Sequence, residues 1–170
     1  GMTGDQPPLN IKSKSGSLIG LEADLAQVLA GAMEVEAKFV VKPFGELLGA
    51  LKSGEIDMVM SGMTITPKRN LDVAFAGPYA VSGKSLLTKS ATLAAADETG
   101  DINLENVSLV ALEGSTSQRF VEEMLPKAKL TKSKTNTAAV RMVLEGQADA
   151  MVADMETCLI AVLRYPEADL

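Results

Sequence analysis

The residues best suited to binding chemistry lie in the stretch SGMTITPKR, residues 61–69. Thr66 followed by Pro67 is typical of a helix start, because a threonine hydroxyl can cap a backbone N–H and proline has no N–H to satisfy. The N–H groups before this helix are expected to point beyond a strand end, where the positive helix dipole attracts anions. Arg69 adds a planar guanidinium that can hold a carboxylate through two hydrogen bonds. The stretch predicts a carboxylate-binding site, although a solvated arginine on a short surface helix would have the same sequence.

Asp154 is a second candidate, because the two halves of the chain resemble each other. The segments LKSGEIDMVMSGM (51–63) and LEGQADAMVADM (144–155) share a helix-ending glycine, an aspartate three residues later and a short apolar run. This similarity places Gly62 and Asp154 at equivalent strand ends. Convergence on a common helix-turn-strand pattern would give the same similarity. Asp154 would also suit the N-cap position of the helix METCLIAVL, and the two roles are compatible.

Alternating strands and helices are expected to position these residues. In the first half, apolar spacing predicts a helix over 21–33, and Pro43 and Gly54 bound a second helix over 43–54. Alternating or short apolar runs predict strands over 35–41, 56–60 and 72–76. This order predicts an α/β fold with parallel β-α-β units and helices on both faces of an open sheet. Ligands of such sheets bind at the carboxyl ends of strands, where Gly62 is expected to lie.

The second half repeats this pattern. Strands are expected over 107–112 and 128–132, and a strand-like run precedes Asp154. Helices are expected within EGSTSQRFVEEMLP, TNTAAVRMVLEG and METCLIAVL, and residues 91–106 are expected to form a short helix or loop. Both halves are therefore expected to be similar α/β units.

Composition argues against several other functions. The chain has 170 residues, 46% of them hydrophobic, enough for one domain or two small lobes. A net charge of −6 without a basic stripe argues against nucleic acid, and no apolar run approaches the ~20 residues of a membrane span. Histidine is absent, and apolar neighbours predict that Cys158, the only cysteine, is a small buried hydrophobe rather than a nucleophile. The run GPYAVSGK fails the phosphate-loop pattern, because Pro78 stands where glycine is required.

SGMTITPKR followed by VAFAGPY closely resembles the signature of the family 3 extracellular solute-binding proteins, the amino-acid receptors of ABC importers. GSLIGLEADLAQVLA and LLGALKSGEIDMVMSG resemble two further stretches of that family, in the expected order. The resemblance implies a two-lobed, type II periplasmic-binding-protein-like fold with an open mixed sheet in each lobe. It places lobe 1 at 1–80, a hinge crossing at 81–85 and lobe 2 at 86–170. Family members return to lobe 1 after this point, so its C-terminal part is expected to be missing.

The resemblance also implies the roles of the site residues. Arg69 would hold an α-carboxylate with the N–H groups of Thr64 and Thr116, while the Gly62 carbonyl, the Thr64 hydroxyl and Asp154 would take the ammonium. A zwitterion satisfies both charges, as buried charges require. The complete expected ligand-binding set is Gln6, Phe44, Ser61, Gly62, Met63, Thr64, Arg69, Leu112, Ser115, Thr116 and Asp154.

Two residues of this set concern the ligand side chain. Phe44 stands where the family commonly has an aromatic lining residue. Gln6 stands where many members stack an aromatic ring on the ligand, so it is a departure that weakens the case for a cationic side chain held between aromatic faces.

The resemblance implies a non-enzymatic, monomeric protein that binds a free amino acid or a similar small zwitterion or carboxylate, without metal or cofactor. It would deliver the ligand to the permease of an ABC importer, in the periplasm or another extracytoplasmic space, and no signal peptide is present. A sensor domain of a membrane receptor or histidine kinase is an alternative. So is an enzyme, because TGDQPP, SGK and AVLRYPEADL resemble cyclohexadienyl dehydratases. Their proton-donor position is Thr157 here, with Glu156 one residue short.

Overall fold

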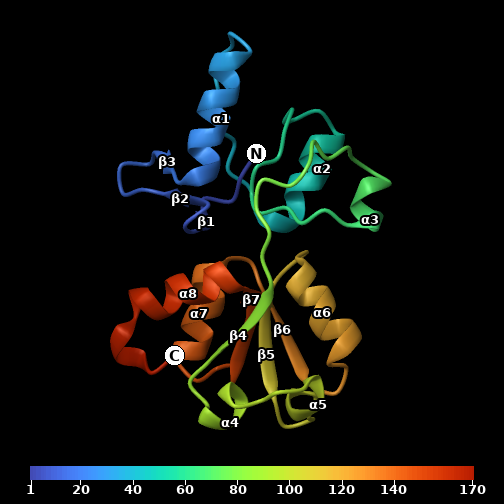
Figure 1. The fold of residues 1–170 in the computed structure, drawn as a ribbon, viewed down its shortest axis with the longest axis vertical. Helices are drawn as coiled ribbons and strands as arrows, with labels where there is room; N and C mark the ends of the chain where they lie inside the picture. The colour runs from blue at the N-terminus through green and yellow to red at the C-terminus, as the bar shows by residue number, and fades with distance from the viewer. The chain divides into compact units, whose positions relative to one another are not determined.

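The computed structural model describes residues 1–170, which form two compact units, Gly1–Val81 (unit 1) and Ser82–Leu170 (unit 2) (Figure 1). Each unit contains its own strands and helices. The identification of these units as lobes joined by a hinge at 81–85 stays a prediction.

Unit 2 is built on a four-stranded sheet in the order β4-β7-β5-β6. The strands are β4 (Lys84–Thr88), β5 (Ser108–Leu112), β6 (Lys129–Ser133) and β7 (Ala150–Asp154). β5 pairs in parallel with β6 and β7, whereas β4 runs antiparallel to β7. The sheet is therefore mixed, and the antiparallel β4 places Lys84 directly opposite Asp154.

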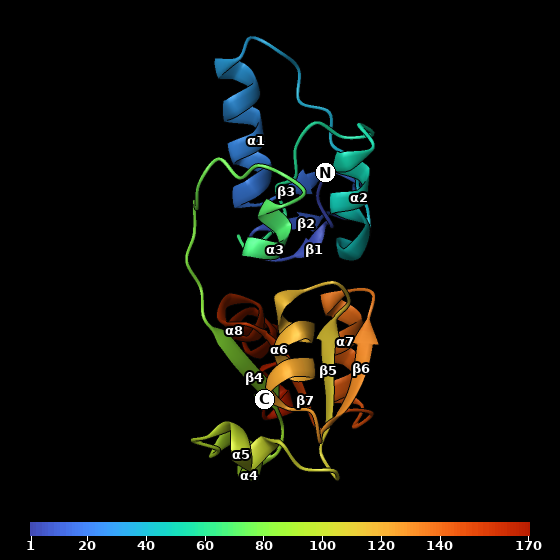
Figure 2. The ribbon, with the colours of Figure 1, turned by 90° about the vertical axis from the view of Figure 1, so that its right-hand side faces the viewer.

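Helices cover both faces of this sheet. They are α4 (Ala91–Ala94), α5 (Thr99–Ile102), α6 (Thr116–Met124), α7 (Asn136–Leu144), α8 (Met155–Arg164) and the 3₁₀ turn η2 (Pro166–Ala168). Figures 1 and 2 show α7 and α8 on one side of the sheet and α6 on the other. Ser115 and Thr135 cap α6 and α7 by accepting backbone N–H bonds at the third helical position.

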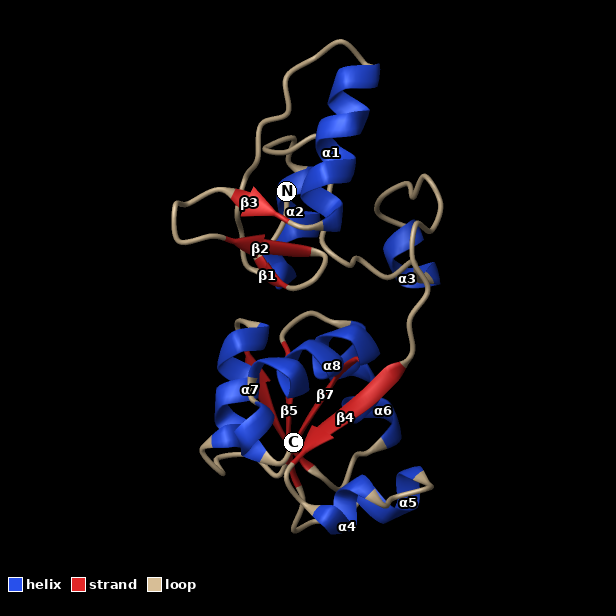
Figure 3. Ribbon diagram, turned by 60° about the vertical axis from the view of Figure 1, so that its left-hand side comes forward, coloured by secondary structure: helices blue, strands red, loops and turns tan.

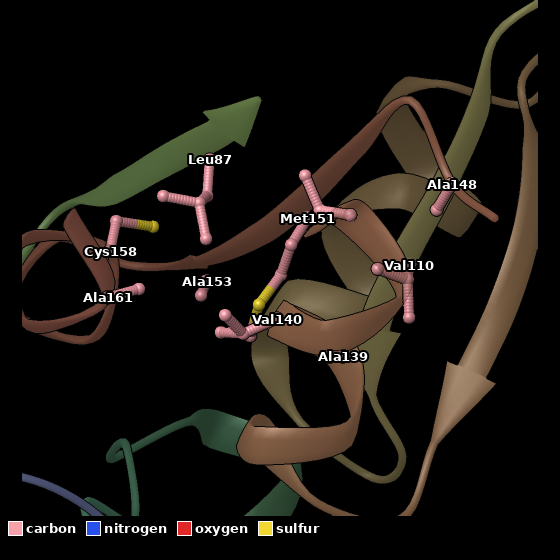
Figure 4. Packing of buried hydrophobic residues seen from close by; sticks show 10 residues of the cluster. Leu87, Val110, Ala139, Val140, Ala148, Met151, Ala153, Cys158 and Ala161 are labelled. Atoms are coloured by element: carbon pink, nitrogen blue, oxygen red, sulfur yellow. The ribbon is translucent and has the colours of Figure 1, made fainter. Parts of the chain in front are cut away.

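Strand alternation explains how one sheet supports two hydrophobic cores. Val110 and Met151 pack with residues of α7 and α8, including Cys158 (Figure 4). Their sequence neighbours Leu109 and Val152 face the other way and pack against α6 and α4. Successive strand residues point to opposite faces, so the continuous apolar runs of β5 and β7 fill both cores.

Unit 1 contains a small three-stranded antiparallel sheet (Figure 3) together with helical segments. The strands are β1 (Asp5–Gln6), β2 (Asn10–Lys12) and β3 (Leu18–Ile19). The helical segments are α1 (Leu21–Ala32), η1 (Phe44–Glu46), α2 (Leu47–Lys52) and α3 (Pro67–Asn70). The expected helix over 43–54 therefore begins as a 3₁₀ turn, and Gly54 follows its end with φ 74°.

The prediction of strands over 35–41, 56–60 and 72–76 is wrong, because none of these segments forms a strand. The N–H of Met2 donates to the Val40 carbonyl, and the N–H of Met60 donates to the Gly1 carbonyl, both at 3.0 Å. Met2 and Val41 form a single isolated parallel bridge. The segments near 40 and 60 are therefore joined to Gly1 and Met2 by isolated hydrogen bonds, without the repeated pairing that makes a ladder.

Candidate functional site

Arg69 is held in place at both its backbone and its side chain. The Thr66 hydroxyl accepts a hydrogen bond from the Arg69 N–H at 3.2 Å, with Pro67 in the first turn, so the expected cap of α3 is confirmed. The Arg69 Nη1 donates to the Thr64 carbonyl at 2.8 Å. Its guanidinium carbon lies 5.6 Å from the ring centroid of Phe44, which is itself buried. Unit 1 therefore presents a half-buried, oriented guanidinium on α3, next to the loop formed by residues 61–66.

The loop that begins at Gly62 is fixed by a buried carboxylate. Glu22, in the first turn of α1, has no solvent exposure, and its Oε1 accepts a hydrogen bond from the Gly62 N–H at 2.6 Å. Its Oε2 accepts from Asn10 Nδ2 at 2.5 Å, and the Tyr79 hydroxyl donates to Oε1. Burial first, and then the bond to Glu22, raise the pKa of Tyr79. Because the Gly62 N–H is used by Glu22, it is not an anion-binding group, while the Gly62 carbonyl takes no part in this bond.

Gln6 and Ser61 form a second buried polar contact beneath the same loop. The Ser61 hydroxyl donates to Gln6 Oε1 at 2.5 Å, and Thr3 Oγ1 donates to the same oxygen at 3.0 Å. Ser61 is fully buried, and a Cβ on Gly62 would lie 3.2 Å from Gln6 Nε2. The Gly62 backbone, at φ 57°, therefore packs closely over Gln6, where a larger residue would be crowded and strained.

The remaining expected residues of unit 1 differ in exposure. Met63 is half-buried and Thr64 is exposed. Together with Gln6, Phe44, Ser61, Gly62 and Arg69, they occupy one continuous region that α3 and the loop before it position.

In unit 2 the candidate residues gather where β7 ends and α6 begins. Asp154 occupies the N-cap position of α8, but its side chain makes no capping bond. Instead its Oδ1 accepts a hydrogen bond from Lys84 Nζ at 2.5 Å. The same Nζ donates to Thr116 Oγ1 at 2.7 Å. Lys84 therefore links the two unit 2 residues expected to bind the ligand's polar groups.

Two other expected residues of unit 2 have structural roles. The Ser115 hydroxyl accepts from the Gln118 N–H at 3.1 Å and so caps α6. Leu112 is buried at the end of β5. The Ser115 hydroxyl is therefore used in the α6 cap, and Leu112 is part of the buried end of β5.

Sequence reasoning missed five residues of these networks, namely Thr3, Asn10, Glu22, Tyr79 and Lys84. Glu22 carried a signal, because an acidic residue stands in the first turn of a predicted helix within a family-like stretch. Lys84 belongs to the SGK stretch that resembles cyclohexadienyl dehydratases, but its position opposite Asp154 depends on the pairing of β4 with β7.

Three further features of the chain concern metal binding, cysteine reactivity and membrane spans. No group of three or more His, Cys, Asp or Glu side chains is arranged to hold a metal ion. Cys158 is buried, and this burial raises the pKa of its thiol to about 11, as expected for a structural cysteine. None of the helices combines the length and apolar character that a membrane crossing requires.

The chain is similar to three known proteins. The chain is 26% identical to cyclohexadienyl dehydratase of Pseudomonas aeruginosa, over 97% of this chain and 62% of that protein. It is 30% identical to the L-arginine-binding protein of the same species, over 91% of this chain and 59% of the relative. It therefore spans less than two thirds of these curated relatives. The solved structure of the ancestral amino acid-binding protein AncCDT-1, a precursor of cyclohexadienyl dehydratase, has a TM-score of 0.87 at 35% identity, over 98% of this chain and 71% of that chain.

These similarities confirm the predicted periplasmic-binding-protein-like α/β fold. Residues 1–155 also match the family described as bacterial extracellular solute-binding proteins, family 3. This match covers α3 with Arg69, the loop before it, the Glu22 network and the Lys84–Asp154 pair. The chain belongs to the bacterial extracellular solute-binding proteins, family 3.

Proposed function

We propose that this protein binds a free amino acid, or a similar small zwitterion or carboxylate, and delivers it to the permease of an ABC importer. Arg69 would hold the α-carboxylate, and Asp154 would hold the ammonium together with the Gly62 carbonyl and the Thr64 hydroxyl. Family membership supports an amino acid ligand and an ABC transporter partner. A periplasmic or other extracytoplasmic location and a monomeric state belong to the same proposal.

The orientation of Arg69 is the observation that carries this proposal. Its backbone is fixed by the Thr66 cap, and its guanidinium is fixed by the Thr64 carbonyl and the face of Phe44. A side chain held in this way loses little further freedom when it binds a carboxylate, so more of the interaction energy appears as affinity. A freely solvated arginine would lack these contacts.

An enzymatic function is the second candidate, because a curated relative is a cyclohexadienyl dehydratase. The proton-donor position of such enzymes corresponds to Thr157, whose hydroxyl cannot replace a carboxylic acid. Glu156 precedes it on α8, where one residue turns a side chain by about 100°. Its carboxylate accepts a hydrogen bond from the Ser82 hydroxyl. We therefore favour binding without turnover.

Isothermal titration calorimetry of the full chain against the twenty amino acids tests the proposal. At least one L-amino acid should bind saturably with one site per chain. A folded protein that gives no heat with any of them would refute it. A parallel turnover assay with prephenate and arogenate should show no product, and product formation that Glu156→Gln abolishes would favour the enzyme instead.

A further inference from the structure

The Lys84–Asp154 ion pair is built into the sheet rather than formed by chance on the surface. Lys84 and Asp154 are direct partners in the antiparallel ladder of β4 and β7, so their side chains leave the same face of the sheet. The next residue, Met155, donates its N–H to the Gly83 carbonyl at 2.9 Å and fixes the register at this end. Any long side chain at position 84 must therefore lie beside the Asp154 carboxylate.

This pair changes what Asp154 can offer to a ligand. Lys84 Nζ lies 2.5 Å from Asp154 Oδ1, and both side chains are about one third exposed, at 27% and 31%. A ligand ammonium would have to share Asp154 with a positive charge already in contact with it. Like charges this close repel one another more strongly in a partly desolvated site than in water. A ligand with a further positive charge on its side chain would be repelled by Lys84 through that charge as well as through its ammonium.

Lys84 can also donate a hydrogen bond to a ligand. A lysine ammonium has three N–H donors, and two of them are used by Asp154 Oδ1 and Thr116 Oγ1. The third donor can serve an acceptor on the ligand. Side-chain carboxylates and amides are such acceptors, and a carboxylate gains the stronger, charge-assisted bond.

We propose that Lys84 determines the ligand class of this site, favouring amino acids with an acidic or amide side chain and disfavouring those with a cationic side chain. This inference rests on the proposed amino acid binding.

Calorimetry on the full chain with L-glutamate, L-glutamine, L-arginine and L-lysine tests the inference. L-Glutamate should bind at least about tenfold more tightly than L-arginine, since the charge-assisted bond is replaced by repulsion. Lys84→Met keeps the aliphatic stem and removes the charge. It should weaken L-glutamate by roughly tenfold and strengthen L-arginine by a similar factor. Lys84→Arg should retain the wild-type order.

Lys132→Met is the matched control. Lys132 lies on β6 of the same unit and pairs with Glu122 at 3.0 Å, so its substitution removes the same charge from a surface ion pair. It should leave all four affinities within twofold. Tighter binding of L-arginine than of L-glutamate by the wild type would overturn the inference alone, as would equal effects of Lys84→Met on all four ligands. Failure of the folded wild type to bind any amino acid would overturn the proposed function and this inference with it.

Discussion

Replacing Glu22 by glutamine should release the Gly62 loop. The Glu22 carboxylate accepts from the Gly62 N–H at 2.6 Å, from Asn10 Nδ2 at 2.5 Å and from the Tyr79 hydroxyl, so each of these three partners donates to it. A glutamine NH₂ group must face one of these donors. Asn10 cannot resolve the conflict by turning over, because its Oδ1 already accepts from the Gly4 N–H at 2.6 Å.

The cost of this mismatch follows from the burial of Glu22, which has no solvent exposure. A buried donor left without an acceptor costs about 1–3 kcal/mol. If Glu22→Gln lowers the free energy of local opening by about 2 kcal/mol, exchange of the Gly62 amide should accelerate about 30-fold.

Hydrogen exchange at the Gly62 amide, measured by NMR, reads this local opening directly. Asp24→Asn is the matched control, because Asp24 is an exposed acidic residue in the same first turn of α1. It removes the same charge near the helix dipole and should leave Gly62 exchange within about threefold. Equal exchange at Gly62 in wild type and Glu22→Gln would refute the assignment of Glu22 as the residue that positions this loop.

Two further predictions concern unit 2. The Cys158 thiol, with its pKa raised to about 11 by burial, should react with thiol reagents at pH 8 roughly 200-fold more slowly in the native protein than in the unfolded chain; comparable rates would contradict its burial. Hydrogen bonds from the Ser108 hydroxyl and N–H hold the pKa of Asp149 below its usual range. Asp149→Asn should therefore lower the free energy of unfolding at pH 7 by less than about 1 kcal/mol, because the carboxylate is mostly exposed. This difference should shrink as the pH falls from about 4 through the lowered pKa, and a difference as large at pH 2 as at pH 7 would contradict the assignment.

Local signals in the sequence predicted much of unit 2 and the start of α3. The Thr66 cap and the continuous apolar run of β7 depend on residues close in the chain, so spacing alone identifies them. The prediction of strands over 35–41, 56–60 and 72–76 in unit 1 was wrong for a different reason. Their apolar patterns are present in the sequence, but a strand also needs repeated hydrogen bonds to a partner strand, and the segments near 40 and 60 make only isolated bonds to Gly1 and Met2.

The candidate site shows the same division between local and distant information. The place of Arg69 in a short helix capped by Thr66 could be predicted, because the cap and the helix lie within four residues of it, while its role as a ligand-binding residue stays a prediction. The bond between Glu22 and Gly62 joins residues 40 positions apart, and the bond between Lys84 and Asp154 joins residues 70 positions apart. No spacing rule connects such pairs, since each depends on how whole elements pack.

The role of Arg69 as the carboxylate anchor is the central claim, and the affinity of Arg69→Ala for the best amino acid ligand tests it most directly. Loss of a desolvated, bidentate contact should cost on the order of 2–5 kcal/mol, or roughly 30-fold to several thousand-fold in Kd. Arg69→Lys should recover only part of this loss, because a point charge cannot reproduce the planar guanidinium. The Tm of both variants, measured in parallel, shows whether they remain folded. A well-folded Arg69→Ala with wild-type affinity would contradict the claim.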